Sequence, residues 1–162
     1  MILVKLPNVG DSSVDVPGYD DGQWFVADSF SFGVEREMRE SGEKGGTEDI
    51  NIGVGELQEC TISKSMDMAS TKLAQFAING NSPGQAVIDF VELSKKGKPT
   101  AYLTYKLDRC FVKSWSSSGD ADDRPTEEVS FYYNRIAFRY AGIRDVFSWD
   151  SIHNTPWTGH GL

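Results

Sequence analysis

Hydrophobic and polar residues alternate through most of this 162-residue chain, and a period of two is typical of half-buried β-strands. The first run has its apolar residues at Ile2, Val4 and Leu6 and is closed by Pro7, after which a loop rich in glycine and aspartate extends to about Gly22. Further runs of the strand period lie at residues 24–26, 30–34, 57–64, 86–93, 101–113, 129–133 and 136–140. The pattern therefore predicts a mainly β protein.

One stretch changes to the helical period. Leu73, Phe76 and Ala77 recur at i, i+3 and i+4, which predicts one short α-helix near residues 68–79. Asp67 and Ser70 are candidate N-terminal caps, because their side-chain oxygens can accept from free backbone amides, and Asn79-Gly80 is a typical left-handed stop. A helix of about ten residues is marginal alone in water, so we expect it to pack against a sheet.

The strand period slips by one residue at two places. The apolar positions change parity beyond Asp108 and again near Asn134, and each change predicts a β-bulge. Bulges curve strands, and paired curved strands favour a barrel or a closed sandwich over a flat sheet. We interpret residues 1–162 as a single domain of this kind, flanked by the one helix.

Three segments lack a clear period. Residues 36–53 are polar and contain four glycines, which predicts a long loop that is either a flexible connection or an interaction arm. Residues 116–124 have turn chemistry throughout. Residues 145–162 form a C-terminal extension that contains Phe147, Trp149 and Trp157 and is aromatic enough to dock on the body of the protein.

The net charge of −8 argues against nucleic acid as a partner, because binding to phosphates requires basic patches. The charge is unevenly distributed: residues 11–59 hold 13 acids and 3 bases, whereas residues 61–115 hold 8 bases and 4 acids. Opposite charge on two parts of one chain is compatible with a head-to-tail contact between copies, and equally with a solvated mosaic of charges.

The residues that carry catalysis or bind metals are sparse. The two histidines, His153 and His160, are separated by six residues and have no cysteine near them, so we expect no metal site and no cofactor. Cys60 and Cys110 lie in strand-like runs, where buried reduced thiols are favoured over a disulfide. A G-x-S-x-G elbow is absent, and no apolar run is long enough to cross a membrane or to act as a signal peptide.

Four stretches, in order, closely resemble the Hcp family, the tube protein of bacterial type VI secretion systems. One stretch resembles the strand-to-helix signature of the family and consists of Thr61-Ile62-Ser63-Lys64 followed by Asp67, Ala69-Ser70 and Leu73. The other three stretches are Asp28–Val34, Tyr102–Leu107 with Val112-Lys113-Ser114, and Asp123–Phe131 through Ile136 and Tyr140. The spacing between Trp149 and Asn154 also matches that between a tryptophan and an asparagine in the C-terminal tail of some members. Thr71 departs from the usual proline of the signature, and loop 36–53 is more charged than expected.

The resemblance implies a small β-barrel of two curved antiparallel sheets, flanked by one helix. It also implies a non-enzymatic, mechanical function. Six copies would form a ring, and rings would stack into a tube tipped by a spike protein, surrounded by a contractile sheath and carrying effectors in its lumen. The protein would be assembled in the bacterial cytoplasm and secreted without a signal peptide. Residues 36–53, which we call the arm, then supply the candidate ring or stacking interface. Ser31 is a candidate lumen position. The interface candidates are Arg36, Glu37, Met38, Arg39, Glu40, Glu43, Lys44, Gly45 and Gly46.

Three alternatives stay open on the sequence. A monomeric barrel that binds a carbohydrate or another small ligand would use exposed aromatics, for which Trp24, Trp115, Trp149 and Trp157 are available. A hydrolase would need His153 or His160 beside a serine or an aspartate. A bacteriophage tail-tube-like protein belongs to the same assembly class.

Overall fold

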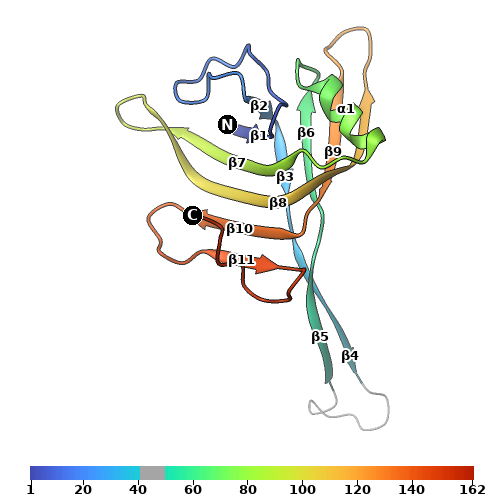
Figure 1. Cartoon of the computed structure of the whole chain (residues 1–162). Helices are drawn as coiled ribbons and strands as arrows, with labels where there is room; N and C mark the ends of the chain where they lie inside the picture. The colour runs from blue at the N-terminus through green and yellow to red at the C-terminus, as the bar shows by residue number, and fades with distance from the viewer. Residues whose placement is uncertain (41–49) are drawn as a thin grey trace.

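The computed structural model describes residues 1–40 and 50–162 (Figure 1). Within these residues one α-helix, α1 (Ser70–Asn79), accompanies eleven β-strands. The strands are β1 (Ile2–Lys5), β2 (Trp24–Ala27), β3 (Ser29–Ser31), β4 (Val34–Glu40), β5 (Ile50–Leu57), β6 (Cys60–Ser65), β7 (Gly84–Leu93), β8 (Pro99–Ser118), β9 (Thr126–Tyr132), β10 (Arg135–Tyr140) and β11 (Phe147–Asp150). The prediction of a mainly β fold with one helix is confirmed.

The long strand β8 organises the body. Its first half pairs with β7 and β10, and its second half pairs with β9, so it belongs to two curved antiparallel sheets. One sheet continues from β7 to β1 and β2, and the other from β9 to β6 and β3, while β11 adds to β10. Figure 1 shows the two halves of β8 bending from the first sheet into the second.

The strand ladder does not close by direct pairing of its two ends, β2 and β3. These strands are consecutive in the chain and are separated by Asp28, whose backbone amide donates to the Ser63 carbonyl at 2.7 Å. The continuous segment from Trp24 to Ser31 therefore pairs with β1 through β2 and with β6 through β3. The predicted small barrel is realised as two curved sheets, with this segment spanning the gap between them.

The β-bulge predicted beyond Asp108 is present, whereas the structure has a break between two strands where a second bulge is predicted near Asn134. Opposite β7, the register of β8 shifts between Leu107 and Cys110, and Arg109 there has a left-handed φ of 50°. The second slip separates β9 from β10 at Tyr133 and Asn134, where the Asn134 amide donates to the Asp108 carbonyl at 3.1 Å. The two irregularities face each other across the ladder, and they bend β8 and its partners together.

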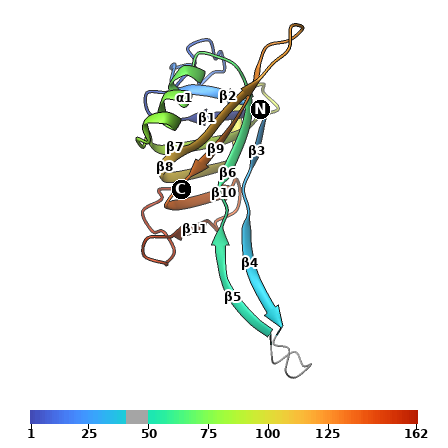
Figure 2. The same ribbon diagram turned by 90° about the vertical axis from the view of Figure 1, so that its right-hand side faces the viewer.

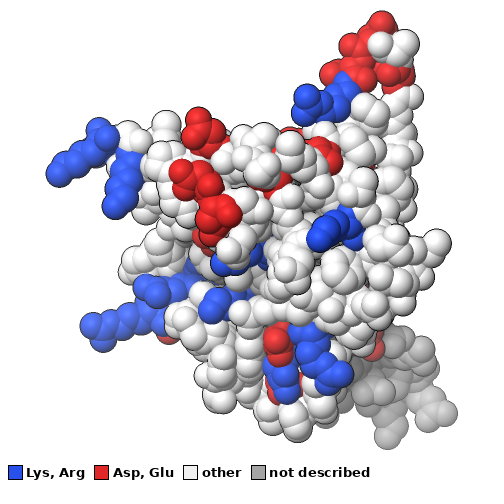
Figure 3. All heavy atoms as spheres, turned by 45° about the horizontal axis from the view of Figure 1, so that its top comes forward, with Lys and Arg blue, Asp and Glu red and all other residues white. Residues whose placement is uncertain are grey.

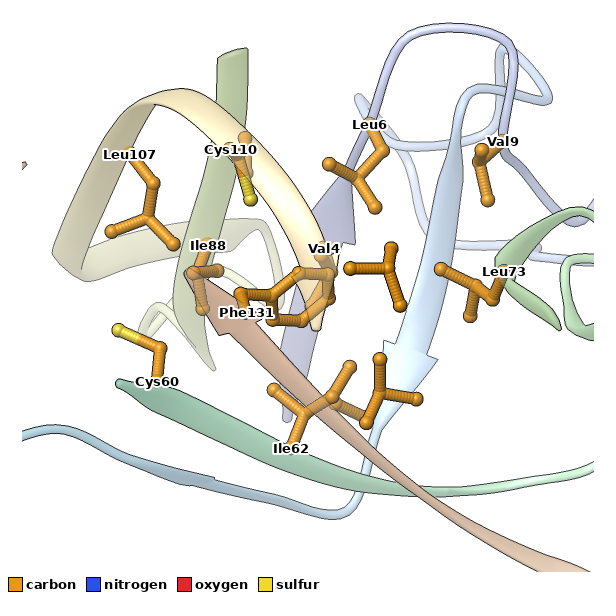
Figure 4. Close-up of a cluster of buried hydrophobic side chains, with 14 of the residues drawn as sticks. Val4, Leu6, Val9, Cys60, Ile62, Leu73, Ile88, Leu107, Cys110 and Phe131 are labelled. Atoms are coloured by element: carbon orange, nitrogen blue, oxygen red, sulfur yellow. The ribbon is translucent and has the colours of Figure 1, made fainter. Parts of the chain in front are cut away.

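The core fills the space between the sheets and under the helix (Figure 4). Alternate residues of β6 and β9 point into it, and Leu73 of α1 is fully buried against it. A smaller cluster around Trp24 lies where β1, β2 and β7 meet the loop that precedes β2. Complete burial of a leucine or phenylalanine side chain contributes about 1.5–3 kcal/mol, so these contacts hold the short helix in place.

The helix begins later than predicted, at Ser70, and ends as predicted at Gly80, which has a left-handed φ of 71°. The assignment of Asp67 and Ser70 as helix caps is corrected, because the N-cap is Ala69 and the structure shows no side-chain cap bond there. Asp67 and Ser70 close the preceding turn instead: Asp67 Oδ1 accepts from the Ala69 amide, and Ser70 Oγ accepts from the Asp67 amide, both at 2.9 Å.

The prediction of a loop over 36–53 is wrong for its two ends. Strands β4 and β5 pair into a separate two-stranded sheet with a register shift between Arg36 and Met38 (Figure 2). The sequence of β5 does alternate, at Ile50, Ile52 and Val54, but glycines and charges obscured this period. The predicted turn region 116–124 is also shorter, because β8 extends through Ser118 and pairs with Thr126.

No helix of the described residues is long and apolar enough to cross a membrane.

Candidate assembly surfaces

The outer face of the sheet formed by β3, β6, β9 and the second half of β8 carries small hydroxyl side chains. Residues pointing inward from β6 and β9 are buried, so the alternating residues between them face outward. Register pairs such as Ser29 with Ser63 and Ser114 with Ser130 place these hydroxyls side by side. We call this surface the hydroxyl face; it comprises Ser29, Ser31, Thr61, Ser63, Ser65, Ser114, Ser116, Ser118, Thr126 and Ser130.

Ser31 lies at the edge of the hydroxyl face, at the end of β3. Its side chain is exposed, whereas the neighbouring Phe30 and Phe32 are partly buried and pack against the main core. The face carries little charge, with Glu128 between Ser63 and Ser116 as one carboxylate on it. It is therefore a hydrogen-bonding surface that offers few fixed charges or large apolar groups.

The candidate interface residues of the arm are distributed over the β4–β5 hairpin. Arg36 is exposed near the base of β4, and Glu37, Met38, Arg39 and Glu40 continue that strand. Glu43, Lys44, Gly45 and Gly46 lie outside the described residues. The hairpin extends from the body at the lower right of Figure 1, so its strands project away from both curved sheets.

A buried charge cluster joins α1 to the sheet, and its central residue, Lys64, is not among the residues predicted from the sequence. Lys64 is fully buried, and its Nζ donates to Glu127 Oε2 at 2.6 Å, to Asp67 Oδ1 at 2.8 Å and to the Ser65 carbonyl at 2.9 Å. Ser70 Oγ lies 3.2 Å from the same amine and donates to Glu127 Oε2 at 2.7 Å. The cluster therefore connects β6, β9 and the first residue of the helix.

Every buried charge of this cluster has a partner. Glu127 Oε1 accepts from the Trp115 indole at 2.6 Å, and the Lys64 amine also lies 5.6 Å from the centre of the Phe25 ring. A signal was present in the sequence, since Lys64 follows Cys60 and Ile62, and Glu127 precedes Val129, at inward positions of the alternation. A charge at an inward strand position requires a buried counter-charge.

The C-terminal extension is held by a second ionic cluster. Arg135 donates to Asp108 at 2.8 Å and to Asp150 at 3.0 Å, and the His153 ring lies 2.9 Å from Asp150. Hydrogen bonds from His153 first, and then from Arg135, lower the pKa of the Asp150 carboxyl well below its usual range. Further along, Lys106 donates to the His160 carbonyl, and the chain after β11 packs back on the body.

The residues that the sequence offers for catalysis or ligand binding make contacts within the protein itself. His153 is occupied with Asp150, and His160 Nδ1 accepts from the Leu162 amide at 2.9 Å. Trp24 and Trp157 are buried, while Trp115 and Trp149 are partly buried. Among the described residues, no group of three or more histidine, cysteine or acidic side chains is arranged to hold a metal ion.

The two cysteines are free thiols and both are fully buried, which confirms the prediction. Burial raises the pKa of Cys60 to about 12, against a partial opposing effect of its hydrogen bond with Tyr133. Burial also raises the pKa of Cys110 above its ordinary range. Thiols of this kind are chemically inert while the protein is folded.

Comparison with known proteins assigns this chain to the class of type VI secretion proteins. The family described as "Type VI secretion system effector, Hcp" matches residues 10–140, and the chain belongs to this family. It is therefore a tube component of the type VI secretion system. None of the curated proteins matches the chain.

Solved structures share the fold. A type six secretion system protein is 23% identical with a TM-score of 0.80, and the match covers 96% of this chain and 98% of that one. Hcp1 from E. coli EAEC 042 is 15% identical with a TM-score of 0.76 over 93% of this chain and 97% of that one. Hcp1 from Salmonella typhimurium is 19% identical with a TM-score of 0.74 over 96% and 97%.

Proposed function

We propose that six copies of this chain form a ring, and that rings stack head to tail into the inner tube of the secretion system. In this proposal a spike protein tips the tube, a contractile sheath surrounds it, and effectors occupy its lumen. The tube is assembled in the bacterial cytoplasm and leaves the cell as a mechanical device without a catalytic step. Membership of the Hcp family supports the assembly class.

The isolated β4–β5 hairpin is the observation that supports the stacking of rings. It forms a separate two-stranded sheet, and two-stranded hairpins are marginally stable in water without a third strand or a packing surface. Its projection from the body makes it available to another subunit (Figure 1). We infer that the hairpin contacts the adjacent ring, with Arg36–Gly46 in that contact.

The hydroxyl face is the surface we assign to the lumen. A passage that holds different proteins and releases them needs weak, exchangeable contacts. Short hydroxyl side chains supply hydrogen bonds without the strong binding of charged or large apolar patches. Ser31 lies on this face with its side chain exposed, which supports its role as a position that contacts cargo.

The experiment for assembly is light scattering behind size-exclusion chromatography, with negative-stain microscopy of the main peak. We expect a mass of about six times 18.0 kDa and ring-shaped particles. A monomer at all salt and protein concentrations would overturn the proposal, and a screen of carbohydrate ligands would then be the next test.

The experiment for the lumen uses the inertness of the native thiols. A Ser31→Cys variant is treated with a small maleimide and with one that carries a long polyethylene glycol chain, before and after tubes form. Thr71→Cys, on the exposed start of α1, is the matched control. We expect the large reagent to be excluded at position 31 only in tubes and to react at position 71 throughout. Equal labelling at both positions in tubes would contradict the lumen assignment.

Cargo retention tests the role of Ser31 directly. Rings of wild type and of Ser31→Gln are purified from the producing bacterium, and the proteins that accompany them are quantified by mass spectrometry. Gln is longer and projects into the passage, so we expect the variant to lose bound effectors. An unchanged set of accompanying proteins would count against the cargo contact.

A further inference from the structure

The tip of the β7–β8 hairpin carries a concentrated positive charge. Lys95, Lys96 and Lys98 follow one another in its turn, and all three are exposed. No described acidic side chain lies within 4 Å of these amines. Lys and Arg side chains gather along the left rim of Figure 3, which is the side where this tip lies in Figure 1.

The base of the β4–β5 hairpin carries the opposite charge. Glu35 and Glu56 are register partners on adjacent strands, and both are exposed. Like charges placed directly opposite each other destabilise an antiparallel pair. Gln58 Nε2 donates to Glu35 at 2.8 Å, but no described basic side chain forms a salt bridge with either carboxylate. The two carboxylates form an acidic pair that a cation from another chain would stabilise.

These two surfaces lie on opposite sides of the molecule. In Figure 1 the lysine tip points to the left and the base of the hairpin lies to the right, and in Figure 2 the hairpin is in front while the tip lies behind. Complementary patches on opposite sides cannot satisfy each other within one chain. They fit a heterologous contact, in which every copy uses one patch for each neighbour and the series closes into a ring.

An apolar hollow lies beside the lysine tip and offers apolar surface that a partner chain can bury. It has a volume of about 280 Å³, and Leu93 on its wall is 73% exposed. Asp15 and Glu92 lie at the hollow as well, and the other residues that line it are Met1, Val16, Pro17, Val91, Gly97 and Pro99. Apolar surface at the centre with charge around it is the usual anatomy of a protein interface.

We propose that the lysine tip of one subunit contacts the Glu35/Glu56 pair of its neighbour within the ring, so that the occupant of this surface is a second copy of this chain. The proposal rests on ring formation, and it adds the residues that set the direction of the ring. The Glu35/Glu56 pair lies at the base of the β4–β5 hairpin, where the hairpin joins the body, so this lateral contact uses the body and not the projecting end that is assigned to stacking (Figure 1).

The test is an exchange of charge. The tip variant is Lys95→Glu/Lys96→Glu/Lys98→Glu, and the pair variant is Glu35→Lys/Glu56→Lys. Each variant alone faces like charge at every contact, and we expect at least a tenfold loss of rings by light scattering at low salt. An equal mixture of the two variants restores opposite charge at every contact and is expected to recover the rings, as is a chain that carries both sets of changes.

Two controls exclude a general effect of net charge. Asp20→Lys/Asp122→Lys changes the net charge by the same amount as the pair variant but at exposed acids elsewhere, and circular dichroism verifies that every variant is folded. Rings from both single variants as abundant as those of the wild type overturn the lateral contact and leave the proposed function intact. Rings that are lost but do not return in the mixture also overturn it. A wild type without rings refutes the proposed function instead.

Discussion

The Lys64 amine lies 2.6 Å from the Glu127 carboxylate, and both side chains are completely shielded from solvent. This ion pair links β6 to β9 beneath the start of α1, and Asp67 and Ser70 complete it. A charge in such a place is tolerated only with its partner, because desolvation of an unpaired ion costs several kcal/mol. The strand-to-helix signature of the family thus has a physical role in this chain, which is to hold a buried cation.

Removal of one member of this pair should weaken the fold strongly. We expect Lys64→Met or Glu127→Gln to reduce the free energy of unfolding by about 3–5 kcal/mol, because the remaining charge or amide keeps no matched partner. Urea denaturation followed by circular dichroism, at one protein concentration because assembly adds to stability, measures the change. Lys113→Met is the control: its pair with Glu59 is exposed, and we expect a loss of about 0–1 kcal/mol. Equal losses in Lys64→Met and the control would contradict the role of the buried pair.

Shortening of the hairpin should separate stacking from folding. Arg36 and Gly55 are register partners, so an Asn-Gly turn can replace residues 37–54 between them. We expect rings of six shortened copies and a melting temperature within a few degrees of the wild type, because the hairpin forms its own sheet. Tubes should be lost in negative-stain images. A matched chain in which residues 119–125 of the β8–β9 turn are replaced by Asn-Gly, between the register partners Ser118 and Thr126, should still form rings that stack. Normal tubes from the shortened hairpin would refute its stacking role.

The buried thiols should make the protein sensitive to alkali. Burial raises the pKa of Cys60 to about 12 from an ordinary value of 9.0, so the folded state holds this proton more tightly than the unfolded chain. The resulting stability is complete below pH 9 and decreases as the pH rises from 9 toward 12. Urea midpoints measured from pH 8 to 11 should fall, and they should fall less in a Cys60→Ser chain. Ellman's reagent should react with Cys60 and Cys110 at least a hundredfold more slowly in the native protein than in urea, and rapid native reaction would contradict this.

The ionic cluster of the tail should respond to acid. Hydrogen bonds from His153 and Arg135 lower the pKa of Asp150, so the folded state favours the carboxylate. The stabilisation is present above about pH 4 and is lost as the pH falls below it. Asp150→Asn should increase hydrogen exchange of backbone amides in residues 147–162 at pH 7, while amides of β6 stay protected. Asp145→Asn, an exposed acid nearby, is the control, and equal protection in both variants would argue against the cluster.

Local pattern was enough for most elements because each depends on near neighbours in the chain. The alternation at Ile2, Val4 and Leu6 matches β1, and the stop at Gly80 matches the end of α1. The phase slips near Asp108 and Asn134 also have a local signature, and the structure has a β-bulge at the first and a break between two strands at the second. Pattern reading failed at residues 36–53, where glycines and charges within the strands are typical of loops, although cross-strand pairing outweighs this weak preference.

The sequence by itself determined the mainly β fold, the single helix, the burial of both cysteines and, through four ordered motifs, the family. These follow from the periodicity of burial and from residues that act within a few positions of one another. Only the tertiary structure decided that Lys64, Asp67, Ser70 and Glu127 form one cluster, and that ten hydroxyls from four strands share a face. It also placed the lysine tip and the Glu35/Glu56 pair on opposite sides. Lys64 and Glu127 alone are 63 positions apart, and strand order and register, which no local period encodes, bring such residues together.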